Sequence, residues 1–180
     1  VNMCRRTLKD VCERLKVDGR TSERALQIFY QVLKSENSPK RKNKELVIAC
    51  LYCASVEVGV SRTIVELEEA SDCSKKKISL MIQKVMVALD VKVENSGPGQ
   101  YVSRFMYKLS IKNMQVEKAV REMLTKIKER GILSNVNNPA IAASTIHYVC
   151  HLNKIPVSIE RLSNVSGSSG ISLRKLYKYF

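Results

Sequence analysis

Cys50 and Cys53 lie in the stretch Cys-Leu-Tyr-Cys, a spacing found in half of a zinc site or in a redox-active dithiol. A structural zinc ion needs four ligands, usually from two such pairs on loops, and this chain has no second pair. A reactive dithiol stands at a helix start beside groups that lower the thiol pKa, whereas the neighbours here are apolar. We therefore predict that both thiols pack inside a helical core.

His147 and His151 are the only histidines, and their i,i+4 spacing places both rings on one face of a helix. A third metal ligand and the glutamate of a zinc-protease motif are missing, so we interpret the pair as structural. The sequence also has no Gly-x-Ser-x-Gly nucleophile motif and no glycine-rich phosphate loop. We predict that the chain is not an enzyme and that these residues hold no metal or cofactor.

The charge of the chain points to its class of partner. Among 180 residues, 31 Lys and Arg stand against 17 Asp and Glu, a net charge of +14. Residues 1–94 carry 18 basic and 13 acidic groups, and residues 95–180 carry 13 and 4. An excess of this size favours a polyanion such as nucleic acid over a membrane or a small-molecule substrate. The longest apolar run, 46–56, is far shorter than the roughly 20 residues that span a bilayer.

The apolar residues recur at helical spacing along almost the whole chain, which predicts an all-α protein. Residues 46–56 and 139–152 are apolar on nearly every side, as in a helix at the centre of a bundle. We expect N-caps at Thr21 or Ser22 and at three later serines, with a capping box from Thr63 to Glu66. The serines are Ser74, Ser158 and Ser169, and Gly131 is the expected C-cap of another helix.

The two halves of the sequence are copies of each other. Each half predicts five helices with an apolar third helix, and each ends in a short helix, a tight turn and a longer helix, which is a helix-turn-helix arrangement. We place the first repeat at 1–93, a linker at 94–99 and the second repeat at 100–180. Corresponding pairs at an offset of 94 or 95 are Leu15 and Leu109, Ala25 and Ala119, Thr63 and Ser158, Leu67 and Leu162, Ile78 and Leu173, and Met81 and Leu176.

Two basic stretches could contact a partner. Lys40, Arg41 and Lys42 lie in a predicted loop that could touch phosphate. The sequence 75–77 places three lysines at the start of a predicted helix, where positive charge opposes the helix dipole. Because no compensation is evident in the sequence, we predict that these lysines contact an acidic partner.

The last predicted helix, 170–178, has the pattern of a recognition helix. Its buried face would hold Leu173 and Leu176, together with Tyr177 or Phe180. Arginine suits bidentate contact with guanine, and an aliphatic side chain suits a thymine methyl group. The predicted DNA-binding residues, on the open side or at the helix start, are Ser169, Ile171, Arg174, Lys175 and Lys178.

The stretch ACLYCASVEVGVSRTIVEL resembles the first cyclin-like repeat of the transcription factor IIB family. Ser74-Lys75-Lys76 resembles the turn into the family's fifth helix. Val102-Ser103-Arg104-Phe105 resembles the start of its second repeat, and residues 139–143 resemble the central helix of that repeat. Residues 158–174 align without a gap to the final helix-turn-helix. The resemblance implies tandem five-helix cyclin folds that bind a complex of promoter DNA with the TATA-box-binding protein and recruit RNA polymerase II in the nucleus.

The resemblance also assigns residues. It implies that Lys75 and Lys76, with Lys77 beside them, bind the TATA-box-binding protein, and that Ile171 and Arg174 read bases beside the TATA box. Any zinc would belong to a ribbon upstream of Val1. The sequence departs from the family pattern at Val56, Asp72 and Lys77, which predicts an altered partner surface. The Gly/Ser-rich segment 167–170 predicts a flexible recognition turn.

Three other functions remain open at this point. The chain could serve RNA polymerase I or III as the equivalent factor. It could be a cyclin that activates a protein kinase, although the basic second half and the lysine-rich turn count against that reading. It could also be a general nucleic-acid-binding module, which would show steep salt dependence and no preference for promoter DNA.

Overall fold

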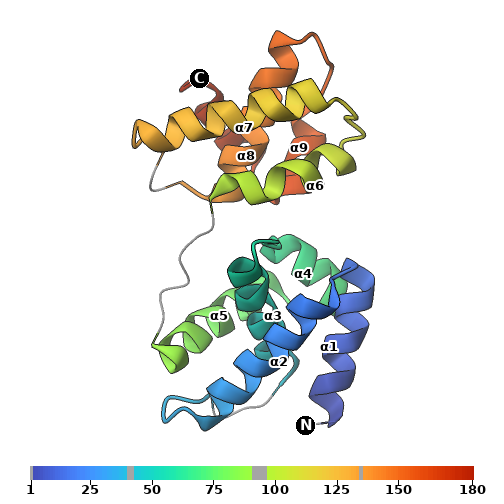
Figure 1. Ribbon diagram of the computed structural model, residues 1–180, viewed down its shortest axis with the longest axis vertical. Coiled ribbons are helices and arrows are strands. Elements are labelled where there is room, and N and C mark those ends of the chain that lie inside the picture. Colours follow the sequence, from blue (N-terminus) through green and yellow to red (C-terminus); the bar gives the residue numbers. More distant parts are fainter. Residues whose placement is uncertain (1, 40–42, 91–96, 134–135) are drawn as a thin grey trace. The chain divides into compact units, whose positions relative to one another are not determined.

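The computed structural model describes residues 2–39, 43–90, 97–133 and 136–180, and all regular structure in these ranges is helical. The chain divides into two compact units, Val1–Asn95 and Ser96–Phe180, each with its own core. Each unit holds five α-helices in its described part, as the sequence predicts (Figure 1). No helix among the described residues is long and apolar enough to cross a membrane.

The first unit is built around one buried helix. Its helices are α1 (Asn2–Leu15), α2 (Gly19–Lys34), α3 (Lys44–Val58), α4 (Ile64–Ser71) and α5 (Lys75–Leu89). Helix α3 contacts each of the other four, which surround it in Figure 1. Its side chains are buried on nearly every face, because the apolar run from Leu46 leaves no polar face for solvent.

The second unit repeats this plan. A 3-10 turn, η1 (Pro98–Tyr101), leads into α6 (Val102–Lys108), α7 (Met114–Glu129), α8 (Asn138–Leu152), α9 (Ile159–Ser166) and α10 (Gly170–Tyr177). Helix α8 contacts η1 and the other four helices (Figure 1). Pro139 stands in its first turn, where the missing N–H breaks no helical hydrogen bond. The apolar third helix of each half is therefore the centre of its unit.

Most predicted helix ends are confirmed, and two differ. Thr63 and Glu66 form the capping box, and Gly131 takes the left-handed conformation next to the end of α7. The cap of α2 is Asp18, whose carboxylate accepts from the backbone N–H of Thr21. The prediction of Thr21 or Ser22 was wrong because the helix begins one turn earlier, at Gly19. Ser74 stands at the N-cap of α5, but its side chain makes no cap hydrogen bond.

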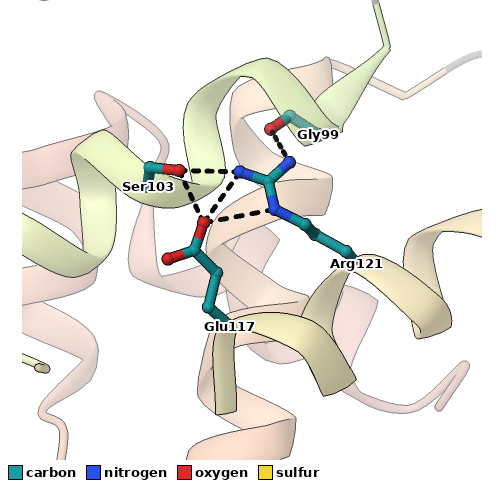
Figure 2. Close-up of polar contacts among 4 residues, drawn as sticks. All are labelled: Gly99, Ser103, Glu117 and Arg121. Carbon is teal, nitrogen blue, oxygen red and sulfur yellow. Dashed lines mark hydrogen bonds and ion pairs between the residues drawn. The ribbon is translucent and has the colours of Figure 1, made fainter. Parts of the chain in front are cut away.

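The segment predicted as a linker falls partly outside the described residues, which exclude 94–96. Pro98 and Gly99, at its far end, belong to η1. Figure 2 shows how this turn is fixed to α7. The Arg121 guanidinium donates to the Gly99 carbonyl (3.2 Å), the Ser103 hydroxyl (2.7 Å) and the Glu117 carboxylate (2.8 Å). The Ser103 hydroxyl in turn donates to Glu117 at 2.6 Å, so one network joins η1, α6 and α7.

Candidate nucleic-acid interface

The second unit ends in two eight-residue helices joined by a tight turn, so α10 is not the longer helix that the sequence predicts. The Ser158 hydroxyl caps α9 by accepting from the backbone N–H of Arg161 (3.2 Å). Gly167 ends α9 in the left-handed region, at φ 69°, where glycine carries no steric penalty. Two residues later, the Ser169 hydroxyl caps α10 by accepting from the backbone N–H of Ser172 at 3.1 Å. Both predicted serine caps are confirmed.

Hydrogen bonds hold the turn between α9 and α10. The Ser163 hydroxyl donates to the Ser168 carbonyl at 2.6 Å, and the Ser168 backbone N–H donates to the Ser166 hydroxyl at 3.2 Å. The Ser166 hydroxyl also donates to the Leu162 carbonyl at 2.8 Å. The Gly/Ser composition predicts a flexible turn; in the structure its serines bind the backbone of the turn and of α9.

Gly170 lets the two helices approach closely. A Cβ atom at this position would lie 3.1 Å from Cγ2 of Ile159, which is tighter than ordinary van der Waals contact. Glycine at the first position of α10 is therefore part of how α10 packs against the start of α9.

The inner face of α10 is anchored on α8. Leu173 and Leu176 are buried there, as predicted, and Tyr177 and Phe180 are half-buried. The Tyr177 hydroxyl shares a 2.8 Å hydrogen bond with Nδ1 of His151, and its ring lies 5.2 Å from that of His147. Burial, together with the nearby His151, lowers the pKa of His147. The two histidines therefore pack against Tyr177 of α10, in agreement with their structural interpretation.

The outer face of α10 combines one apolar side chain with basic ones. Ile171 is 66% exposed, and Arg174, Lys175 and Lys178 are exposed as well. All four point away from the face that carries Leu173 and Leu176, because they occupy other positions of the helical turn. Ser169, which is also predicted to bind DNA, caps the helix with its hydroxyl, which lies 2.9 Å from the Ser172 hydroxyl.

The first unit has the same ending with a different outer face. The side chains of Lys75, Lys76 and Lys77 are exposed at the start of α5. The Glu68 carboxylate accepts a 2.7 Å hydrogen bond from the backbone N–H of Lys75, and thus places negative charge at the helix N-terminus. Lys77 lies 3.9 Å from Glu45. The sequence argument that the positive charge at this helix start is uncompensated was therefore wrong in part. It missed Glu68 and Glu45 because they lie on other helices, α4 and α3.

The chain matches the family described as the transcription factor TFIIB repeat twice, over residues 1–86 and over residues 91–180. The chain belongs to the TFIIB repeat family. It is 26% identical to transcription initiation factor IIB of Drosophila melanogaster over 171 residues, covering 95% of this chain and 54% of the relative. It is 26% identical to transcription initiation factor IIB 2 of Haloferax volcanii over 156 residues (87% and 47%) and 24% identical to the Homo sapiens factor IIB over 168 residues (93% and 53%).

The chain thus spans about half the length of the curated relatives that it matches. The two matches coincide with the two helical units, so the internal duplication seen in the sequence is a tandem pair of TFIIB repeats. The TFIIB repeat has the cyclin-like fold, which confirms the predicted fold class of tandem cyclin-like units with a helix-turn-helix at the end of the second.

Within the first TFIIB repeat, the two cysteines of the opening motif lie in the core. Cys50 and Cys53 are 1% and 0% exposed on α3. Burial raises the pKa of the Cys53 thiol to about 12 and raises that of Cys50 as well, so both stay protonated at neutral pH. No group of three or more potential metal-ligating side chains occurs among the described residues. Core packing of the two thiols is confirmed.

Two departures from the family pattern have structural explanations. Val56 is buried in α3, so it belongs to the core and not, as predicted, to a partner surface. Asp72 ends α4 in the left-handed conformation, and its carboxylate lies 3.6 Å from the Arg14 guanidinium on an exposed part of the TFIIB repeat. Lys40, Arg41 and Lys42, the predicted phosphate contacts, lie outside the described residues.

Two further residues position the TFIIB helix-turn-helix endings and were missed in the sequence. Glu68 caps α5 from seven residues away, and Arg161 donates from α9 to the Leu109 carbonyl at 3.0 Å. Neither follows a local sequence rule, because each partner lies beyond the reach of one helical turn. For Glu68, the one available signal is its place in the short helix α4, directly before the lysine-rich start of α5.

Proposed function

We propose that the chain is the core of a general transcription initiation factor that binds promoter DNA together with the TATA-box-binding protein and bridges this complex to RNA polymerase II. It would act in the nucleus. The names of the relatives support a role in transcription initiation. The observation that carries the DNA-binding part is the outer face of α10, where Ile171, Arg174, Lys175 and Lys178 are exposed on a helix that is fixed on its inner side.

In this function, α10 enters the major groove. Arg174 can bind the two acceptors of a guanine, and Ile171 can contact a thymine methyl group. Lys175 and Lys178 provide phosphate contacts, which place the protein but do not read sequence. The hydrogen-bonded turn and the buried Leu173 and Leu176 hold these groups on one rigid element, as base recognition requires.

The start of α5 supports a different kind of contact. The ammonium groups of Lys75 and Lys76 are exposed, and no ion pair is found for either among the described residues. Glu68 binds the backbone N–H of Lys75 and leaves both side chains available. Two adjacent lysines on a rigid helix start fit an acidic protein surface, which we propose to be that of the TATA-box-binding protein.

Replacement of Arg174 by Ala tests base recognition. We expect Arg174→Ala to relax discrimination at one base pair beside the TATA box by about 1–3 kcal/mol, because a bidentate contact is lost. The measurement is a titration of the chain onto preformed DNA complexes of the TATA-box-binding protein, each with one flanking base pair changed. Arg130→Ala, an exposed arginine after α7, is the matched control. Unchanged discrimination in Arg174→Ala would show that α10 reads no base there.

Charge reversal at α5 tests the protein contact. Lys75→Glu with Lys76→Glu should weaken assembly on the complex of the TATA-box-binding protein with DNA, because two attractive pairs become repulsive. Lys84→Glu, two turns further along the exposed side of α5, is the control. Intact assembly of the double variant in a gel shift would rule out this assignment.

Copurification of the chain with RNA polymerase II, compared with copurification with polymerases I and III, tests which enzyme the factor serves.

A further inference from the structure

The corner between α6 and α7 has an unusual surface. It carries two large side chains that face solvent, Tyr107 at 78% and Met114 at 88% exposed. Lys108 and Lys112 lie between them in the sequence and are exposed too. We call these four residues the α6–α7 corner. None of the four belongs to the core of the second unit, so the corner presents a phenol and two basic side chains at the surface.

The corner is fixed to the helix-turn-helix. The Arg161 guanidinium on α9 donates to the Leu109 carbonyl at 3.0 Å, and α9 contacts both α6 and α10. Within the corner, the Ile111 backbone N–H donates to the Met106 carbonyl at 2.9 Å, and the Asn113 side chain caps α7. Movement of the corner relative to α9 would break the Arg161–Leu109 hydrogen bond, and α9 packs against α10, so the corner and α10 are connected through α9.

The charges around the corner leave it positive. The sequence has no acidic residue from Gly97 to Val116. Three of the four carboxylates in the second unit lie on α7, where Glu117 pairs with Arg121 at 2.8 Å and Glu122 with Lys118 at 4.0 Å. The fourth, Glu160, lies on α9. Lys112 thus lies in a stretch that has no carboxylate of its own, whereas Lys118 has one within reach.

We propose that the α6–α7 corner is a second nucleic-acid contact, which binds backbone phosphates of the same DNA duplex that α10 enters. The inference rests on the proposed function of α10. In helix-turn-helix proteins the helix before the recognition helix crosses the DNA backbone, and here that helix is α9, to which the corner is tied. Lysine ammonium groups and a tyrosine hydroxyl are suitable phosphate donors. The corner contributes affinity and register, and α10 contributes sequence preference.

The test compares two lysines that differ only in their surroundings. Lys112→Gln and the control Lys118→Gln remove the same charge from the same unit. Each full chain is titrated onto a preformed complex of the TATA-box-binding protein with promoter DNA over a range of salt concentrations. We expect Lys112→Gln to lower the slope of log affinity against log salt by about 1 and to weaken binding equally on all flanking sequences. The control should leave the slope unchanged, and Tyr107→Phe should weaken binding without changing it.

Neutral phosphates identify the contacted group. Single methylphosphonate substitutions are scanned along both strands of the DNA. At one position, the loss of binding free energy from Lys112→Gln combined with the neutral phosphate should be smaller than the sum of the two separate losses, because both changes remove the same contact. Additive losses at every position would place Lys112 against a protein surface and overturn the inference, as would equal losses for Lys112→Gln and Lys118→Gln. If the unchanged chain does not join the complex, the proposed function fails before any variant is compared.

Discussion

The two helix-turn-helix endings of this chain are built on the same buried positions and differ on their outer faces. Leu67 and Leu162 are fully buried in α4 and α9, and Ile78 and Leu173 are buried in α5 and α10. The outward positions Ser79, Leu80 and Gln83 of α5 correspond to Arg174, Lys175 and Lys178 of α10. The shared positions therefore belong to the fold, and the differing positions are where the proposed partners of the two repeats would be distinguished.

The turns of the two endings are stabilised in different ways. In the first unit, Asp72 adopts the left-handed conformation at φ 56°, and Glu68 binds the start of α5. In the second unit, Gly167 takes the left-handed position and serine hydroxyls bind the turn. A carboxylate across the turn suits a helix that begins with lysines. Hydroxyls add no negative charge at the start of α10, which suits the proposed contact of that helix with DNA phosphates.

The largest expected effect comes from the shared buried positions. Leu67→Ala and Leu162→Ala should each lower the free energy of unfolding of their own unit by about 2–5 kcal/mol, because each leaves a cavity in a closed core. Urea unfolding with hydrogen exchange resolved by residue would assign each loss to one unit. A loss shared equally between both units would mean that the two cores unfold together and that the comparison of independent repeats does not hold.

A smaller effect should separate the two caps. Ser169→Ala removes a hydroxyl that accepts from the Ser172 backbone N–H, and should cost about 0.5–2 kcal/mol of stability. Ser74→Ala removes a hydroxyl that makes no cap hydrogen bond, and should change stability by less than about 0.5 kcal/mol. Thermal unfolding of both variants provides the measurement. Equal losses would indicate that Glu68 does not replace the cap of α5.

The smallest effect concerns acid stability of the second unit. Hydrogen bonds from Ser103 and Arg121 lower the pKa of Glu117 below its ordinary value of 4.5. A carboxylate with a depressed pKa in the folded state adds stability above its unfolded pKa, and that stability is lost as the pH falls through the folded value. Glu117→Gln should therefore make the second unit less sensitive to pH below about 4.5, by no more than the roughly 0.2–1 kcal/mol of an exposed pair. An unchanged pH profile from stability measurements between neutral and acidic pH would contradict this role.

The sequence was sufficient to predict what depends on local periodicity. The apolar stretches identified α3 and α8 as the central helices, and the offset of 94 or 95 identified the duplication. The inner and outer faces of α10 also follow from helical spacing alone, because Leu173 and Leu176 stand three residues apart.

What the sequence could not predict depends on groups that meet only in the folded chain. Arg121 reaches the Gly99 carbonyl 22 residues away, and Arg161 reaches that of Leu109 from 52 residues away. The error at α2 has a different cause, since Asp18 was as good a cap as Thr21 or Ser22 by residue type. Composition alone could not predict the hydrogen bonds of the turn 167–170, because serine occurs in defined turns as well as in flexible segments.

The close approach at Gly170 has a consequence for how the specificity of this protein could be changed. The corresponding position in the first repeat is Lys75, so a side chain is tolerated there. In the second repeat a single added methyl group would press on Ile159, 3.1 Å away, so that either the Ile159 side chain or α10 would have to move by a few tenths of an ångström. Gly170→Ala is therefore a way to change how α10 packs, and with it the proposed base contact of Arg174, without altering any residue on the outer face of α10.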